Sequence, residues 1–293
     1  MSHRRTASGI SNLSLFHNAS GTVYVEGGDS LTSTEIKTGK YNVRSYDILF
    51  WELVFSLFRP DRKYHFKALG SKTTLSSIMS GIEEGTIRRT VVCADRDFDH
   101  INGRKSKSSE VLYTHGYSWE NDVWSANVVE SIFLMLCPVA SGQLDVGPLI
   151  RRSLEILEAS LYWPVVADFL CALMDATVIP RDSLACVIHD SVKLPQLDRV
   201  LLRSRVRAAR SRRPKGCKLK GVQKPNVSRD CCGHLFGHLC YLVLIYYLRT
   251  SECSISLNKD VANALAIKSF SERLEDTPDL LDHYRAQFAG VTI

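Results

Sequence analysis

The sequence predicts an α/β fold with a mostly parallel sheet flanked by helices, followed by a mainly α-helical C-terminal half. Up to about residue 137, short apolar runs rich in β-branched and aromatic residues alternate with segments of helical periodicity. Beyond Pro138 the apolar residues recur at helical spacing and no convincing strand is evident. The chain of 293 residues is long enough for two domains, and its composition, 45% hydrophobic and 23% charged, excludes a disordered or collagen-like protein.

The N-terminal half is expected to open with a polar lead-in over residues 1–20 and to continue as an α/β domain over residues 21–137. Glycines end the first two strand-like runs, Pro60 follows one helical pattern, and Ser71 or Thr73 can cap the next. A polar loop is expected at residues 29–45. The predicted strands are residues 22–25, 64–69, 90–94 and 110–114, and the predicted helices are residues 46–58, 71–84 and 118–136.

The C-terminal half, residues 138–293, is predicted to be a helical domain with an irregular excursion at residues 195–225 between two helical groups. Its basic stretch, residues 199–229, holds twelve Lys and Arg and no Asp or Glu. An uncompensated block of positive charge suits a nucleic acid, although a solvated loop that only aids solubility has the same composition. The expected helices are residues 147–178, 232–250 and 259–288.

Cysteine usage and hydropathy favour a cytoplasmic location. The nine cysteines stand at irregular spacings, several of them inside apolar runs, which is typical of free thiols in a reducing compartment. No secretory signal is recognisable at the N-terminus. The longest apolar stretch, Cys240–Leu248, is about half as long as a bilayer span. We therefore expect a cytoplasmic protein that does not enter a membrane.

Acidic residues directly follow two of the predicted strands. Glu26 ends the first strand, and Asp95, Asp97 and Asp99 follow the third. In a parallel α/β sheet, ligands bind beyond the carboxyl ends of the strands, so these acids are expected at one site. Mg²⁺ takes oxygen ligands and keeps waters and substrate phosphates in its shell. The pattern predicts metal-assisted phosphoryl chemistry, the alternative for each acid being a turn or a solvated surface position.

The spacing of these acids resembles a known fold family. A Glu at the end of one strand and an Asp-x-Asp after another, about seventy residues later, are similar to the two signature motifs of the TOPRIM fold. That fold is found in topoisomerases, DnaG-type primases and overcoming-lysogenization-defect nucleases. The resemblance covers roughly residues 20–135 and implies a TOPRIM-like catalytic domain.

A closer resemblance rests on five short motifs taken together. They are Val23–Ser30, Leu69–Lys72, Cys93–Asp99, Ser118–Asn121 and Gly233–His234. In this order they are similar to the AriB family, the TOPRIM-type nuclease effector subunits of PARIS anti-phage defence systems. The resemblance implies a nuclease that an ABC-type ATPase sensor subunit (AriA-like) restrains until a phage protein is sensed, with host tRNA as its substrate.

The acids receive roles under this hypothesis. Asp95 and Asp97 are expected to bind Mg²⁺ or Mn²⁺, and Glu26 to bind the ion or to act as general base on the attacking water. Asp99 or Glu120 would complete the metal shell. The active form is expected to be a homodimer, since a phosphodiester-cleaving site can need two subunits.

Basic residues are candidates for contacts to the scissile phosphate. Lys72 stands at a predicted helix N-terminus, where free backbone N–H groups favour a phosphate, and Arg96, Lys105 and His234 are further candidates. The sequence leaves two alternatives open. One is a DNA endonuclease with the same site, and the other is a non-catalytic nucleic-acid-binding regulatory module.

Overall fold

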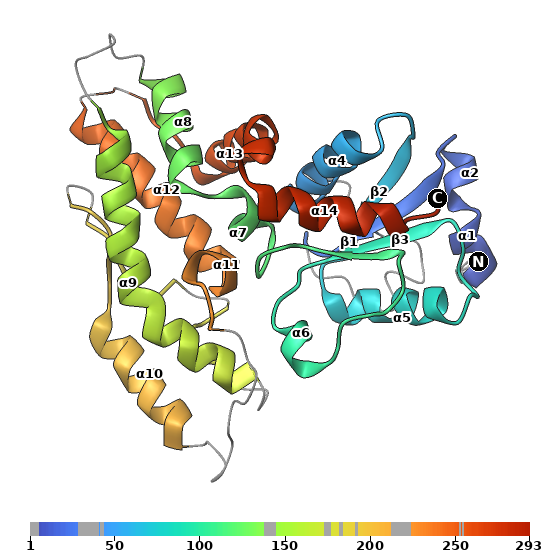
Figure 1. Cartoon of the computed structure of the whole chain (residues 1–293), viewed down its shortest axis with the longest axis horizontal. Helices are drawn as coiled ribbons and strands as arrows, with labels where there is room; N and C mark the ends of the chain where they lie inside the picture. The colour runs from blue at the N-terminus through green and yellow to red at the C-terminus, as the bar shows by residue number, and fades with distance from the viewer. Residues whose placement is uncertain are drawn as a thin grey trace. The chain divides into compact units, whose positions relative to one another are not determined.

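The chain forms two compact units (Figure 1). The computed structural model describes residues 6–28, 41, 44–137, 145–172, 177–181, 184–190, 193–211, 224–251, 253 and 255–293. The sheet unit comprises Met1–Arg96, Lys105–His115 and Ser271–Ile293, and the helical unit comprises Asp97–Arg104 and Gly116–Phe270. Almost all of the polar loop expected at residues 29–45 lies outside the described residues.

The sheet unit is built on a four-stranded sheet in which all neighbouring strands are parallel. The strands are β1 (Gly21–Val25), β2 (Tyr64–Ala68), β3 (Thr90–Ala94) and β4 (Val111–Tyr113). Their order is β2-β1-β3-β4. Every residue of the two central strands is buried, because helices cover both faces, and this explains their mostly apolar sequences. The expected α/β class and the four strands of the N-terminal half are confirmed.

Helices that cover this sheet include α4 (Tyr46–Phe58), α5 (Lys72–Glu83) and α14 (Pro278–Gly290). Figure 1 shows α4 and α14 on one face and α5 on the other. The Phe55 ring of α4 packs edge-on against Phe66 of β2 and Phe288 of α14, with centroid distances of 5.4 and 4.9 Å. On the other face, Leu75 and Ile78 of α5 are buried in one cluster with Tyr24 and Val92. The expected helices at residues 46–58 and 71–84 are confirmed.

The C-terminal helix α14 belongs to the sheet unit and satisfies the backbone of its edge strand. Gln287 accepts a hydrogen bond from the backbone N–H of Tyr113 at 2.7 Å and donates one to the Tyr113 carbonyl at 2.7 Å. His283 contacts the same carbonyl at 2.9 Å. The chain thus returns to the sheet unit over Ser271–Ile293, whereas the sequence predicts a single helical domain over residues 138–293.

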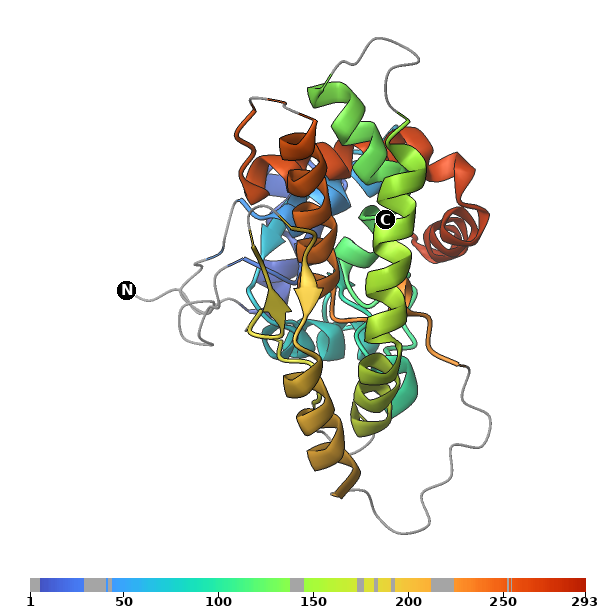
Figure 2. The same ribbon diagram turned by 90° about the vertical axis from the view of Figure 1, so that its left-hand side faces the viewer.

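The helical unit consists mainly of α-helices. They are α6 (Asp99–Asn102), α7 (Trp119–Val123), α8 (Ala126–Leu136), α9 (Gly147–Ala172), α10 (Arg199–Ser211), α11 (Val227–Asp230), α12 (Gly233–Thr250) and α13 (Lys259–Arg273). Figures 1 and 2 both show α10 alongside α9. A two-stranded antiparallel pair, β5 (Val187–Ile188) and β6 (Gln196–Leu197), precedes α10.

Several boundaries differ from the prediction for local reasons. The helix expected at 118–136 is two helices, because Ser125 is extended and its side chain caps the second helix through the N–H of Val128. The irregular excursion expected at 195–225 contains the helix α10, and the strands β5 and β6 were not predicted. The helix expected at 259–288 is interrupted by the 3-10 turn η1 (Leu274–Asp276).

The polar lead-in also has structure of its own. It forms two short helices, α1 (Ala7–Ser11) and α2 (Leu13–Phe16), and the Ser11 hydroxyl accepts a hydrogen bond from the backbone N–H of Arg88 at 2.9 Å.

Within the described parts of the chain, every helix is too short or too polar to cross a bilayer. The eight cysteines among the described residues are all free thiols.

Candidate functional site

The carboxyl ends of the two central strands bring Glu26 and Asp95 together. β1 and β3 pair in parallel with Val25 opposite Cys93, and the N–H of Glu26 continues the ladder to the Cys93 carbonyl at 3.0 Å. Glu26 therefore leaves β1 beside Asp95, the residue that follows β3. Its Oε2 accepts a hydrogen bond from the backbone N–H of Asp95 at 3.2 Å. The first and third strands thus meet as the parallel-sheet argument predicts.

Lys72, the first residue of α5, completes this arrangement. Its backbone N–H donates to Glu26 Oε1 at 3.2 Å, and its Nζ donates to the Asp95 carbonyl at 2.5 Å. The Nζ also lies 4.0 Å from Glu26 Oε2, and the Lys72 and Glu26 side chains are 23% and 19% exposed. A carboxylate at a helix N-terminus is favoured by the helix dipole and by the free N–H groups there. We call Glu26, Lys72 and Asp95 the strand-end cluster.

Two glycines allow the loops around this cluster to approach each other. Gly27 and Gly70 have φ of 96° and 85°, a region that residues with a side chain rarely adopt. The N–H of Gly70 donates to the Gly27 carbonyl at 2.8 Å, which ties the loop after β1 to the loop before α5. A Cβ at Gly27 would overlap the carboxylate of Asp47. The close backbone approach holds Glu26 and Lys72 in place.

Arg96 is the last residue of the sheet unit on this segment. Its backbone N–H donates to Thr114 Oγ1 at 2.9 Å, and the N–H of Thr114 donates to the Ala94 carbonyl at 3.2 Å. The Thr114 contact therefore anchors the chain just after β3. Sequence reasoning placed Thr114 only at the end of a strand, and a lone Thr there carries no signal of a role.

Asp97 and Asp99 belong to the helical unit. Asp97 has φ of 46°, an uncommon conformation for a residue with a side chain, and its N–H donates to the Tyr117 carbonyl at 2.8 Å. Asp99 is buried at the start of α6, and its carbonyl accepts from the N–H of Arg104 at 3.0 Å. Residues Asp99–Asn102, which lie between the predicted strands 90–94 and 110–114 in the sequence, are therefore helical.

Glu120 and His234 form a pair within the helical unit. His234 Nδ1 lies 2.5 Å from Glu120 Oε1, and the hydroxyl of Ser118 donates to Glu120 Oε2 at 2.5 Å. The His234 side chain is 71% exposed, whereas that of Glu120 is 7% exposed. Burial raises the pKa of Glu120, but the hydrogen bond and charge of His234, with the Ser118 hydroxyl, outweigh it and hold the pKa below its usual value. Both carboxylate oxygens are thus engaged.

Gly233 makes this pair sterically possible. It is the first residue of α12, and a Cβ there would overlap the hydroxyl of Ser118 and crowd the Glu120 carboxylate. The N-terminus of α12 can therefore approach α7 closely, which places negative charge near a helix N-terminus. The Gly-His dipeptide was noted in the sequence, but the role of Ser118 as a partner of Glu120 was not.

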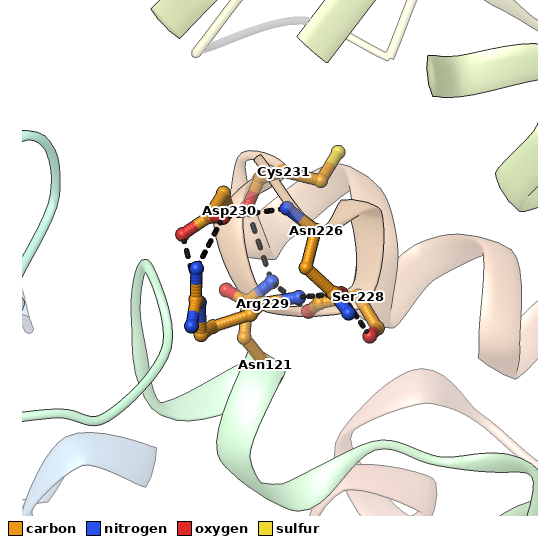
Figure 3. Close-up of polar contacts among 6 residues, drawn as sticks. All are labelled: Asn121, Asn226, Ser228, Arg229, Asp230 and Cys231. Carbon is orange, nitrogen blue, oxygen red and sulfur yellow. Dashed lines mark hydrogen bonds and ion pairs between the residues drawn. The ribbon is translucent and has the colours of Figure 1, made fainter. Parts of the chain in front are cut away.

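Asn121 anchors α7, and with it Glu120, to the short helix α11. Its Nδ2 donates to the carbonyls of Ser228 at 2.7 Å and Cys231 at 3.1 Å. Figure 3 shows the turn that it clamps, in which Arg229 pairs with the buried Asp230 at 3.1 Å. These bonds satisfy the carbonyls at the end of a very short helix.

A second buried network was not foreseen from the sequence. The Arg181 guanidinium lies 2.7 Å from Asp168 of α9 and 5.0 Å from the ring centre of Tyr117. Burial raises the pKa of Asp168, even though Arg181 and the N–H groups of Val178 and Ile179 favour its charged form. No motif marks these residues, because they come together only when the segment after α9 folds back.

The donor set of the strand-end cluster suits a hard divalent cation. Mg²⁺ is commonly held by one or two carboxylates together with waters and substrate phosphates, and Glu26 and Asp95 are two carboxylate residues at adjacent strand ends. Among the described residues, no three His, Cys, Asp or Glu side chains gather into a metal-binding group.

Comparisons with known proteins add no family assignment. The chain matches no protein-family model, and no curated protein gives a significant match. The α/β fold with its four-stranded parallel sheet is shown by the structure itself.

Proposed function

We propose that this chain is a metal-dependent TOPRIM-type nuclease that hydrolyses phosphodiester bonds in host RNA, with tRNA as its substrate. The observation that carries the proposal is the strand-end cluster. Two acidic residues and a lysine meet at the carboxyl ends of adjacent parallel strands, where α/β sheets bind their ligands.

Each residue of the cluster has a role that its contacts support. Mg²⁺ or Mn²⁺, when bound to Glu26 and Asp95, would supply an activated water and stabilise charge on the leaving oxygen. Glu26 is the alternative acceptor for the proton of the attacking water. Lys72 has its ammonium beside Glu26 and the Asp95 carbonyl, and it would bind a phosphate of a substrate held at this cluster.

The remaining predicted residues keep their proposed roles around this cluster. Asp97 follows Asp95 by two positions in the chain, and it is proposed to share the metal. Asp99 or Glu120 would complete the shell, and Glu120 would first have to exchange its contacts with Ser118 and His234. Arg96 and His234 are proposed to contact the substrate.

The biological setting is proposed from the resemblance to the AriB family alone. In that setting the chain is the toxic effector of an anti-phage abortive-infection system. An AriA-like ABC-type ATPase sensor restrains it, and the active form is a homodimer. A cytoplasmic location is part of the same proposal.

A second candidate function is supported by a different feature. α10 carries five arginines and no acidic residue over Arg199–Ser211, which suits a nucleic-acid-binding regulatory module without catalysis. A DNA endonuclease with the same strand-end cluster is the third possibility, since the cluster itself does not select the sugar.

Incubation of purified protein with bulk tRNA and with plasmid DNA tests these functions, with Mg²⁺ or Mn²⁺ present or chelated and the products resolved on denaturing gels. Three proteins are compared: the parent, Glu26→Gln, and Glu84→Gln, which neutralises an exposed carboxylate at the end of α5. We expect discrete tRNA fragments from the parent and from Glu84→Gln, and cleavage reduced at least about 100-fold in Glu26→Gln.

The other outcomes select among the alternatives. Cut plasmid with intact tRNA favours the DNA endonuclease. Equal cleavage by the parent and by a folded Glu26→Gln protein overturns the catalytic assignment. Binding of tRNA without any product, with metal present, favours the regulatory module.

A further inference from the structure

A basic groove runs between α9 and α10 in the helical unit. It has a volume of about 670 Å³. Figures 1 and 2 show the two helices that form its walls. On the α10 side it is lined by Arg199, Arg203, Arg207 and Arg210, and on the α9 side by Arg152, Glu155 and Trp163, among others. It is a feature of the helical unit alone and contains none of the strand-end cluster.

The arginines on the α10 wall form a regular row. Arg199, Arg203 and Arg207 recur every four residues, which places them on one face of the helix at intervals of about 6 Å. All of them are exposed. Among the described residues that line it, Glu155 is the one acidic residue, and it lies 3.4 Å from Arg152. The groove therefore presents a strong net positive charge along its length, which is complementary to a chain of phosphates.

An apolar pocket opens next to this groove. It has a volume of about 380 Å³, and its lining includes Val166, Leu170 and Ala209. Trp163 and Arg210 belong to the linings of both cavities. The Trp163 side chain is 64% exposed, so its indole is accessible to a ligand in either cavity. A row of cations thus ends beside a flat aromatic ring and an apolar pocket.

We propose that this groove binds a single-stranded polynucleotide, with its phosphates on the arginine row and an unstacked base against Trp163. Single-strand-binding surfaces combine these two components: a positive groove follows the backbone and aromatic side chains stack the bases. Loops and ends of an RNA offer such unstacked bases. The proposal names the substrate-holding surface of the nuclease and to that extent rests on the proposed function.

An acidic peptide is the competing occupant, because it would also pair with the arginine row. Such a peptide gives no reason for an exposed indole next to an apolar pocket, whereas every nucleobase has a flat face that stacks on an aromatic ring. Duplex nucleic acid uses the arginines equally well but keeps its bases stacked, so it does not fill the pocket beside Trp163.

Fluorescence anisotropy with full-length protein tests the proposal, with metal chelated so that no cleavage occurs. The probes are labelled single-stranded RNA and DNA of about twelve nucleotides and a duplex of the same sequence. The variants are Arg203→Glu in the row and Trp163→Ala at the junction. Arg88→Glu makes the same charge change at an exposed arginine of the sheet unit and serves as control.

We expect Arg203→Glu to weaken single-strand binding by about tenfold or more and to flatten its salt dependence. Trp163→Ala is expected to weaken single-strand binding by about tenfold while affecting the duplex much less. Arg88→Glu should bind as the parent does. Binding of both RNA and DNA strands supports backbone-and-stacking recognition, and binding of RNA alone adds a contact to the 2′-hydroxyl.

The proposal is overturned if the parent does not bind the single strand, or if the parent and both groove variants bind it equally well. It is also overturned if poly-glutamate of equal charge displaces the probe and Trp163→Ala has no effect on probe binding, because an acidic peptide is then the better occupant. Glu26→Gln separates it from the proposed function. If Glu26→Gln binds the single strand as the parent does, and the parent cleaves no nucleic acid, the groove binds a polynucleotide but the chain is not a nuclease.

Discussion

The carboxylate of Glu26 accepts a hydrogen bond from the backbone N–H of Asp95, which follows it by 69 residues in the chain. The same carboxylate accepts a second hydrogen bond from the backbone N–H of Lys72. Two strand ends and one helix start are thus joined through one side chain. Changes to these residues should affect chemistry more than folding, because the side chains are partly exposed.

Lys72→Met is expected to reduce RNA cleavage by about 10- to 100-fold, since it removes a cation that contacts the Asp95 carbonyl and lies near Glu26. The change in thermal stability should be small, because ion pairs with this exposure contribute about 1 kcal/mol or less. Single-turnover cleavage and thermal unfolding measure the two effects. The matched control is Lys63→Met, which changes an exposed lysine before β2. An equal loss of activity in that variant would contradict the proposed role of Lys72 in the site.

Gly27→Ala is expected to destabilise the protein by roughly 2–5 kcal/mol, because it combines an unfavourable φ with an overlap against Asp47. Gly85→Ala is the comparison, since Gly85 also has a positive φ but a Cβ there would meet nothing within 4 Å. Its cost should be only about 1–2 kcal/mol. Urea unfolding measures the stability loss of both variants. Equal midpoints would show that the loop beside Glu26 accommodates the added methyl group without strain.

Stability should fall as the pH drops from about 6.5 toward 4, in part because of His283. Burial lowers the pKa of His283 to about 4, with the charges of His115, Lys105 and Arg96 acting in the same direction and the Tyr113 carbonyl opposing them. Between the two pKa values the unfolded chain binds a proton that the folded chain does not, so unfolding is favoured as the pH falls.

His283→Gln should therefore lose part of this pH dependence, about 2 kcal/mol between about pH 7.5 and about pH 5. Urea unfolding midpoints at the two pH values measure it. His189→Gln, at an exposed position of the helical unit, should retain the pH dependence of the parent. An unchanged slope in His283→Gln would show that other groups carry the acid sensitivity.

Asn121→Ala is expected to lower the free energy of unfolding by roughly 2 kcal/mol, because it leaves the carbonyls of Ser228 and Cys231 without their donor. Asn127→Ala, at an exposed position of α8, should cost less than about 0.5 kcal/mol. Chemical unfolding monitored in the helical unit compares the two. Similar costs would mean that water replaces Asn121 in the turn that Figure 3 shows.

Glu120→Gln should destabilise the protein near neutral pH, since the native contacts of Glu120 with His234 and Ser118 favour its charged form. A carboxylate whose pKa is lowered in the folded state contributes stability above its unfolded pKa of about 4.5 and loses it as the pH falls through the lowered value. The difference between parent and variant should thus shrink below about pH 4.5. Unfolding midpoints over this range, with the exposed Glu155→Gln as control, test it, and a constant difference would contradict the charge-based explanation.

Local patterns in the sequence are sufficient to predict the sheet and two of the three residues of the strand-end cluster. Parallel strands that are buried on both faces have nearly continuous apolar sequences, and the segments around Val23 and Val91 are therefore predicted as strands. The acids that follow such strands in the chain necessarily leave the sheet at one edge. This is why the sequence alone predicts that Glu26 and Asp95 lie at the same edge of the sheet.

Only the tertiary structure decided what those residues touch and where distant segments dock. Three contacts join residues far apart in the chain: that of Lys72 with both acids, that of α14 with the edge strand through His283 and Gln287, and that of Glu120 with His234. The same holds for the groove between α9 and α10, because its charges come from a stretch whose composition fits a loop or a helix equally well. Periodicity and strand ends are local properties that the sequence determines by itself. Side-chain partnership depends on how the elements pack, and no local pattern encodes it.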